Sequence, residues 1–248
     1  MTKDRLVWVV PCFEEAARLD PAAFLALADG AAATRVLFVD DGSRDGTLAV
    51  LQALARERPD LIEVVALPEN RGKAEAVRHG LRRALDQQAG ILGYVDADLA
   101  TPPAELARLA RLMRDGDYDL LMGSRVQLLG RAIARSSVRH YLGRVFATCA
   151  SLCLGLPVYD TQCGAKLFRP TAALGAALAT PFVSRWAFDV ELLDRLLHPP
   201  AGVAPADRGR LREEPLCAWT DVPGSKVRPL AALRGGIDLV RLAIGSRR

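Results

Sequence analysis

Two carboxylates stand one residue apart at the end of an apolar run. Asp96 and Asp98 follow Ile91–Val95 with only Ala97 between them. Like charges this close repel one another unless a cation offsets them. Carboxylate oxygens are the hard ligands that Mg²⁺ and Mn²⁺ prefer, and two of them leave coordination positions for the oxygens of a diphosphate. The pair therefore predicts a divalent metal site. The alternative is a solvated loop in which an Asp caps the next helix.

Further polar clusters follow other apolar runs. Asp40 and Asp41 open a Gly-Ser-Arg-Asp-Gly-Thr stretch, so one of them can accept from a base N–H or a ribose hydroxyl. A simple turn with a helix cap is the alternative. Asn70–Lys73 places two cations at the expected start of a helix, which suits phosphate contacts or a solvated cap. The remaining clusters are Pro11–Glu15 and Gly123–Arg125.

These clusters follow short apolar runs that alternate with helical segments rich in Ala, Leu and Arg. The alternation predicts an α/β fold with a doubly wound, mostly parallel sheet and helices on both faces. Ligands of such sheets bind beyond the carboxyl ends of the strands, so the clusters should meet at one edge. We expect strands over 6–10, 35–39, 62–67, 91–95 and 119–122, and helices over 14–29, 46–58, 72–88 and 103–115.

The alternation stops after Arg125. We expect a helix over 131–156, another over 186–197, a surface loop over 199–210 and a strand over 211–220 that is too short to found a second core. A length of 248 residues fits one such domain.

Composition limits the partners. The formal charge of +4 is mild, but arginines recur at 131, 135, 139 and 144, which favours an anionic ligand over a nucleic-acid surface. Five cysteines without a C-x-x-C pair, with only three histidines, argue against a disulfide framework or a zinc cluster. There is neither a signal-peptide apolar region nor a run of about 20 apolar residues. We expect a cytoplasmic protein, or one peripheral on the inner face of the membrane, and no nucleic-acid partner; the oligomeric state does not follow from these features.

In their order, these motifs resemble family 2 glycosyltransferases with the GT-A fold. No G-x-G-x-x-G follows the first strand and no G-x-x-x-x-G-K-[ST] occurs, which argues against a dinucleotide oxidoreductase and a P-loop NTPase. Later motifs narrow the resemblance to dolichyl-phosphate β-glucosyltransferases and their prokaryotic polyprenyl-phosphate relatives. These motifs are Gly123–Arg125, Asp160–Phe168, Arg185–Leu193, and Trp219 followed by Gly224–Val227.

The resemblance implies an inverting transfer of a sugar, with glucose favoured, from a UDP-sugar to a polyprenyl or dolichyl phosphate, with Mg²⁺ or Mn²⁺. It also implies a nucleotide-sugar and metal-binding half over 1–125 and an acceptor-binding half over 126–248. Asp96 and Asp98 would hold the metal. The implied nucleotide-sugar contacts are Pro11, Phe13, Glu15, Asp40, Asp41, Lys73, Asp96, Ala97, Asp98 and Lys226.

On the acceptor side, Arg125 with Arg135 or Arg139 would bind the acceptor phosphate. A phosphate is already ionised at neutral pH, so it needs placement more than deprotonation. Asp160 and Asp189 would bind the sugar or, for a hydroxyl acceptor, one of them would be the general base. The structural alternatives are a turn at Asp160 and an i,i+4 helix pair of Arg185 with Asp189.

The sequence also departs from the family pattern. Cys12-Phe13-Glu14 stands where the family usually has Ala-Tyr-Asn, Ala165 replaces the usual Phe, and the membrane helices of many relatives are missing. A transferase of the same fold with a soluble acceptor, such as a secondary metabolite or a sugar phosphate, is therefore the second hypothesis. A sugar nucleotidyltransferase is the third, although it would be expected to have a glycine-rich loop near the N-terminus. The uncharged segment 145–158, after the arginines, fits either a peripheral membrane contact or a buried helix.

Overall fold

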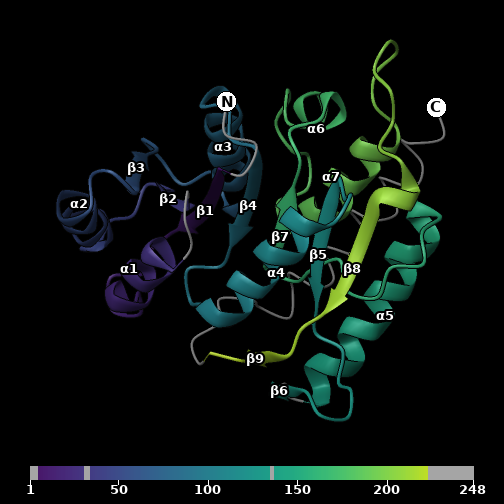
Figure 1. The fold of residues 1–248 in the computed structure, drawn as a ribbon, viewed down its shortest axis with the longest axis horizontal. Coiled ribbons are helices and arrows are strands. Elements are labelled where there is room, and N and C mark those ends of the chain that lie inside the picture. The colour runs from purple at the N-terminus through teal and green to yellow at the C-terminus, as the bar shows by residue number, and fades with distance from the viewer. Residues whose placement is uncertain (1–4, 31–33, 135–136, 223–248) are drawn as a thin grey trace.

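The computed structural model of the chain describes residues 5–30, 34–134 and 137–222. They form one α/β domain around a seven-stranded sheet in the order β3-β2-β1-β4-β7-β5-β8, which confirms the expected fold class (Figure 1). The strands of this sheet are β1 (Leu6–Cys12), β2 (Thr34–Asp40), β3 (Ile62–Ala66), β4 (Ile91–Val95), β5 (Leu120–Ser124), β7 (Ala165–Phe168) and β8 (Leu211–Pro215).

The sheet is parallel except at one strand. β1 pairs in parallel with β2 and β4, β2 with β3, and β5 with β8, whereas β7 runs antiparallel between β4 and β5. Because β7 is reversed, the segment that precedes it reaches the same sheet edge as the carboxyl ends of its neighbours. Two short parallel strands, β6 (Ala132–Ala134) and β9 (Ala218–Thr220), form a second sheet, seen at the lower edge of Figure 1.

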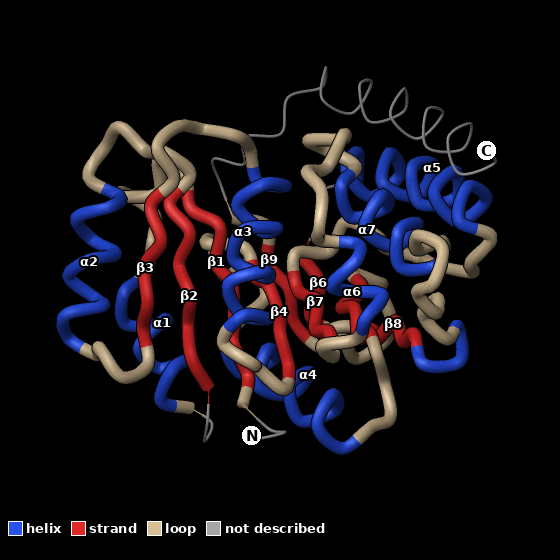
Figure 2. The backbone as a smooth tube through the Cα atoms, turned by 90° about the horizontal axis from the view of Figure 1, so that it is seen from above, coloured by secondary structure: helices blue, strands red, loops and turns tan. Residues whose placement is uncertain are grey.

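Helices cover both faces of the large sheet, as Figure 2 shows from above. One buried cluster packs α3 (Lys73–Asp86), α5 (Ser137–Leu154), α6 (Ala172–Ala177) and α7 (Phe188–Leu197) against one face. The other packs α1 (Pro21–Asp29), α2 (Thr47–Glu57) and α4 (Pro103–Asp115) against the opposite face. A strand buried on both sides needs apolar residues at successive positions, and this explains the unbroken run Leu6–Val10.

The predicted helix over 14–29 is wrong in its first half, since α1 begins only at Pro21. Asp20 accepts a hydrogen bond from the N–H of Ala23 (3.1 Å) and caps the helix. Glu14, ahead of this cap, adopts a left-handed φ of 52°, which an α-helix does not allow.

The second half of the chain also differs from expectation. The predicted helix over 131–156 begins at Ser137 because residues 132–134 pair with β9 instead. The predicted strand over 211–220 is divided in two, and its parts β8 and β9 belong to different sheets. Leu216, between them, is fully buried. The sequence also predicts neither β7 nor α6, which are only four and six residues long. No helix in the described part of the chain is both long and apolar enough to cross a bilayer.

Candidate active site

The structure brings the predicted clusters together at the carboxyl edge of the sheet. Asp40 ends β2, Asp96 follows β4, and Arg125 follows β5. The reversed strand β7 brings Asp160 and Gly164, which precede it, to the same edge. In Figure 1 the arrowheads of β4, β5 and β8 point toward this lower edge.

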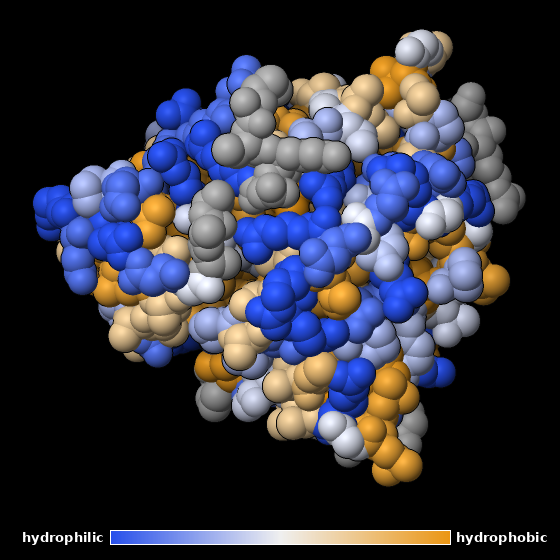
Figure 3. Space-filling view, in the orientation of Figure 1, coloured by the Kyte–Doolittle hydropathy of each residue, from blue (hydrophilic) through white to orange (hydrophobic). Residues whose placement is uncertain are grey.

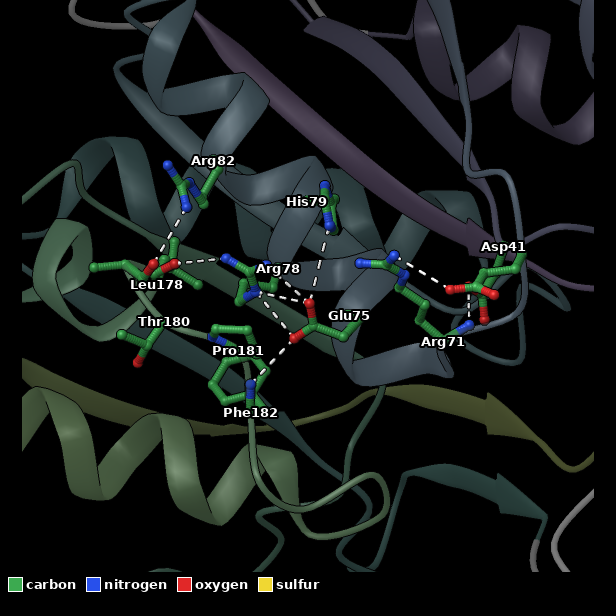
Figure 4. A network of polar contacts seen from close by, with 12 residues as sticks. Asp41, Arg71, Glu75, Arg78, His79, Arg82, Leu178, Thr180, Pro181 and Phe182 are labelled. Carbon is green, nitrogen blue, oxygen red and sulfur yellow. Dashed lines mark hydrogen bonds and ion pairs between the residues drawn. The ribbon is translucent and has the colours of Figure 1, made fainter.

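Asp41 joins the end of β2 to the start of α3. Its carboxylate accepts hydrogen bonds from the backbone N–H groups of Arg71 and Gly72, both at 2.8 Å (Figure 4). Burial raises the pKa of Asp41, assisted by the neighbouring Asp40, although the two N–H groups and Arg185 oppose the shift. The N–H groups at the start of α3 therefore bind a carboxylate of the chain itself.

Gly42 allows this close arrangement. Its φ is +66°, and a Cβ there would lie 2.6 Å from the carbonyl carbon of Glu69. Any side chain at this position would push away the loop that leads into α3. Packing alone therefore requires a glycine directly after Asp41.

The rest of that motif braces the loop after β1. The backbone N–H of Glu14 donates to Ser43 Oγ (2.9 Å), and that of Glu15 donates to Thr47 Oγ1 (2.8 Å). Ser43 Oγ in turn donates to Asp40 (2.5 Å). Asp40 therefore acts through Ser43 on the loop that carries the predicted donor contact Glu15. The predicted contacts Pro11, near the end of β1, and Phe13, at the start of this loop, are both half-buried.

Lys73, the first residue of α3, meets the carboxylate pair. Its Nζ lies 2.5 Å from Asp96 Oδ1, and its side chain is 41% exposed. Burial would lower the pKa of Lys73, but the carboxylates of Asp96, Asp189 and Asp98 outweigh it and raise that pKa. Lys73 is thus held fully charged at the centre of the edge.

Asp98 faces the same edge with less compensation. The N–H of Ala100 donates to its Oδ1 (3.1 Å), and Arg18 Nη2 lies 3.6 Å from its Oδ2. Burial, followed by the nearby Asp96, raises the pKa of Asp98. A carboxylate that is 22% exposed and carries excess negative charge suits a divalent cation.

The donor set fits a cation shared with a ligand. Within the described residues, no three His, Cys, Asp or Glu side chains are grouped as a complete metal site. A cation held by Asp98 and Asp96 would have two carboxylate side chains from the protein, and phosphate oxygens would have to supply other ligands. Ala97 between them is buried.

Gly164 lies against the carboxylate of Asp96. A Cβ on Gly164 would be 2.1 Å from Asp96 Oδ2, and Gly164 O accepts from the N–H of Asp96 (3.2 Å). A side chain at residue 164 would displace the carboxylate. This glycine therefore positions Asp96, a role that its place in a Gln-Cys-Gly motif does not reveal.

A buried polar cluster lies beneath Lys73. Lys166 Nζ, 1% exposed, donates to Asp189 Oδ1 (2.8 Å), to Tyr94 Oη (2.8 Å) and to Cys163 O (2.6 Å). Tyr94 also donates to Asp189, and burial together with Asp189 raises the pKa of Tyr94 well above its ordinary value. Asp189 is 3% exposed and is engaged by these two side chains. The alternative of an i,i+4 helix pair with Arg185 does not apply, because α7 begins only at Phe188, after Arg185.

Arg125 and Asp160 form a two-point ion pair. Arg125 Nε and Nη2 donate to the two carboxylate oxygens of Asp160 at 2.6 and 2.8 Å. Asp160 outweighs burial and raises the pKa of Arg125, whose guanidinium lies 5.3 Å from the ring centroid of Trp219. The backbone N–H of Asp160 donates to Glu213 of β8 (2.6 Å). The sequence predicts that Arg125 binds the acceptor and that Asp160 binds the sugar or acts as a base. In the structure the two side chains form one ion pair.

Arg185 is an exposed cation near this edge to which sequence reasoning gave no site role. Its Cδ would lie 3.8 Å from a Cβ on Gly72, and it lowers the pKa of Asp41. Its loop is attached to α3, because the N–H of Phe182 donates to Glu75 (3.1 Å) and Arg78 Nη1 donates to Leu178 O (3.1 Å) (Figure 4). No spacing signal links residue 185 to residue 72.

Three predicted contacts cannot be placed. Lys226 lies outside the described residues, as do Arg135 and the side chain of Arg139.

The comparisons with known proteins cover most of the chain. The model of glycosyl transferase family 2 matches residues 7–171. The chain is 35% identical to a dolichyl-phosphate β-glucosyltransferase of Drosophila melanogaster over 86% of this chain and 65% of that protein. The corresponding human protein is 32% identical over 94% of this chain and 72% of its own length. The chain thus spans about two thirds of the length of these relatives.

Solved structures agree on the fold. A crystal structure of glucosyl-3-phosphoglycerate synthase from Mycobacterium tuberculosis, in complex with Mn²⁺, uridine diphosphate and glucosyl-3-phosphoglycerate, superposes with a TM-score of 0.67. It covers 97% of this chain and 79% of the other at 16% identity. With the family model over two thirds of its residues and the GT-A fold over nearly all of them, the chain belongs to glycosyl transferase family 2.

Proposed function

We propose that the chain transfers a sugar, with glucose favoured, from a UDP-sugar to a polyprenyl phosphate, with inversion at the sugar carbon. Relatives named dolichyl-phosphate β-glucosyltransferase match 86–94% of the chain at 32–35% identity, and their name supports glucose as the sugar and a polyprenyl-type phosphate as the acceptor. The observation in the structure that carries the proposal is the meeting of Lys73, Asp96 and Asp98 with the Arg125–Asp160 pair at one edge.

The donor side follows from charge. Lys73 and Arg185 lie at the start of α3, where a diphosphate would meet two cations. Asp98, with Asp96, would hold Mg²⁺ or Mn²⁺, which would offset the negative charge of the departing diphosphate. The loop that carries Pro11, Phe13 and Glu15, with Asp40 and Asp41 behind it, would hold the nucleoside.

The kind of acceptor is inferred from two carboxylates that are already paired with cations. Asp160 is bonded to Arg125, and Asp189 to Lys166 and Tyr94. A hydroxyl acceptor needs a base to take its proton, whereas a phosphate attacks the sugar carbon as an anion and the nucleoside diphosphate leaves. Two paired aspartates therefore favour the phosphate. Asp160 would orient Arg125 toward it, and the 1–125 and 126–248 halves would serve donor and acceptor.

A transfer assay tests this assignment. The protein is incubated with UDP-glucose, Mn²⁺ and either a short polyprenyl phosphate or a sugar phosphate, and products are identified by mass spectrometry. We expect a glycosyl phosphodiester of the prenyl chain. Product from the sugar phosphate alone would support the second candidate, a soluble phosphorylated acceptor. Release of UDP without product from any acceptor would contradict both.

Arg125→Lys probes the acceptor contact without leaving Asp160 unpaired. Lysine keeps the charge but loses the planar fork, so only one of the paired contacts can persist. We expect acceptor kcat/KM to fall about tenfold to a hundredfold, equivalent to about 1.5 to 3 kcal/mol, with UDP affinity unchanged. A matching loss of UDP affinity, measured by calorimetry, would move Arg125 to the donor site.

We also propose that the protein is cytoplasmic and contacts the inner face of a membrane. A polyprenyl phosphate is held in a bilayer by its apolar chain, so the site must reach the surface of that bilayer.

A further inference from the structure

An apolar turn projects from the loop between β5 and β6. Leu128 is 48% exposed and Leu129 is fully exposed. The N–H of Arg131 donates to Leu128 O (3.1 Å), and Gly130 has a φ of +79°, so Leu129 and Gly130 are the central residues of a closed turn. One exposed leucine is ordinary on a protein surface, but turns favour polar residues, and two leucines in succession at a turn are unusual.

The base of this turn is attached to the second sheet. The N–H of Ala132 donates to Cys217 O (2.9 Å), and the guanidinium of Arg131 donates to Cys217 Sγ. β6 then pairs with β9 through Ile133 and Trp219. A turn fixed at its base presents Leu129 in one direction without paying the ordering cost of a flexible loop on contact.

Charge points to the kind of partner. Residues 126–159 contain four arginines and no Asp or Glu. Four is also the formal net charge of the whole chain, so the remaining residues are together neutral. Of these arginines, Arg144 is exposed on α5 and stacks 4.3 Å from the ring centroid of Tyr159. An anionic bilayer has negatively charged headgroups above an apolar acyl layer. A basic segment with an apolar turn is complementary to such a surface.

Position connects the turn with the candidate active site. Leu128 is three residues after Arg125, which limits the distance between their Cα atoms to about 10 Å. The guanidinium of Arg125 lies over Trp219 of β9, the strand that pairs with β6 beyond the turn. In Figure 1 β6 and β9 lie below the carboxyl ends of β5 and β8, and Figure 3 shows apolar surface projecting at that same lower edge.

We propose that the Leu128–Leu129 turn inserts into the interfacial layer of an anionic bilayer and sets the mouth of the site at its surface. The acceptor part of this inference rests on the proposed function, whereas the insertion of the turn does not. A prenyl chain whose phosphate meets Arg125 would then leave the protein beside two leucines already in the apolar layer. Arg144, exposed on α5, would lie at the level of the lipid phosphates.

Vesicle binding tests the insertion. The full chain and its Leu128→Ser/Leu129→Ser variant are sedimented with vesicles of phosphatidylcholine and phosphatidylglycerol. Both positions are exposed, so the variant should fold. Each leucine contributes about tenfold when it leaves water, so we expect partition to fall by about tenfold to a hundredfold. Val183→Ser is the matched control, because Val183 is 79% exposed on the loop between α6 and α7. It should bind as the unaltered chain does, and vesicles of phosphatidylcholine alone should bind both less.

Equal partition of the double variant and the unaltered chain would overturn the insertion, as would an equal loss in Val183→Ser. Sedimentation velocity without lipid tests whether the turn instead contacts a second copy of the chain. If the unaltered chain self-associates and the double variant does not, the inference fails.

Activity separates this inference from the proposed function. In the double variant, transfer to a water-soluble short-chain polyprenyl phosphate should be unchanged, while transfer to a long-chain acceptor in vesicles should fall with the partition. An equal loss on both acceptors would contradict the inference. If no acceptor gives product but vesicle binding still depends on the leucines, the proposed function fails and the inserting turn stands.

Discussion

At the scale of single residues, the aspartates of the site differ in how closely a cation approaches each carboxylate. Asp96 faces Lys73 at 2.5 Å and Asp160 faces Arg125 at 2.6 Å, whereas Asp98 meets Arg18 only at 3.6 Å. Of these three aspartates, Asp98 therefore has the least compensated charge and the most to gain from a divalent cation. This difference between two aspartates of the same motif is not visible in their spacing.

Replacing Asp98 by Asn should abolish metal-supported transfer while the fold is kept. The side-chain volume hardly changes, but the charged ligand is lost, and we expect kcat to fall at least a hundredfold, equivalent to about 3 kcal/mol. Asp117→Asn is the matched control, since Asp117 is 84% exposed and pairs with Arg210. Near-normal turnover of Asp98→Asn in Mn²⁺, with an unchanged Mn²⁺ dependence, would contradict the assignment.

The raised pKa of Asp41 has a defined effect on the pH dependence of stability. Between the ordinary value of 3.8 and the raised pKa, the folded chain binds more protons at this carboxyl than the unfolded chain does. The contribution of Asp41 to the free energy of unfolding therefore falls as pH rises through that window. Asp41→Asn does not titrate, so its stability relative to the unaltered chain should increase over the same range. Urea unfolding at several pH values measures this; a difference that is constant or of the opposite sign would refute it.

At the scale of elements, the site depends on connections between segments that are distant in sequence. The reversed strand β7 supplies Lys166, which meets Asp189 at the start of α7 and Tyr94 in β4. Glu75 in the first turn of α3 likewise attaches the loop that carries Arg185. Each connection is made by a buried or half-buried charged side chain, whose partner must remain present.

Lys166→Met should destabilise the fold, because it leaves the buried carboxylate of Asp189 without its ammonium partner. Breaking one side of a buried pair costs about 3 to 5 kcal/mol. Adding Asp189→Asn removes the unpaired charge, so the double variant should regain part of that loss. The free energies of unfolding in urea provide the comparison. If the double variant is no more stable than Lys166→Met alone, this ion pair does not connect β7 to α7.

At the scale of the whole molecule, one sheet joins the motifs proposed to bind the nucleotide, after β1, β2 and β4, to those proposed to bind the acceptor, after β5 and β8. Ligands that bind across this edge should stabilise the entire domain, since the sheet is continuous and both helical layers pack on it.

UDP with Mn²⁺ should therefore raise the thermal midpoint. A ligand at a hundred times its dissociation constant adds about 2.7 kcal/mol, which is about 5 to 10 °C for a domain of this size. UDP without metal should raise it less, and Asp98→Asn should lose the metal-dependent part. Differential scanning fluorimetry measures these shifts. An equal rise with and without Mn²⁺ would show that nucleotide binding does not use the metal.

The sequence by itself determined the α/β class, the five strand-end clusters and the family, because apolar periodicity and motif order are local properties of the chain. It also located Lys73, Asp96 and Asp98 correctly at one edge, since parallel strands bring their carboxyl ends together. Helix and strand bounds failed where partners were distant: the backbone N–H groups of residues 14–16 donate to side chains of residues 43–47, and residues 132–134 pair with β9. Only the tertiary structure decided which carboxylate faces which cation. That choice depends on the reversed strand β7 and on close approaches such as Gly164 to Asp96, between residues that no sequence spacing connects.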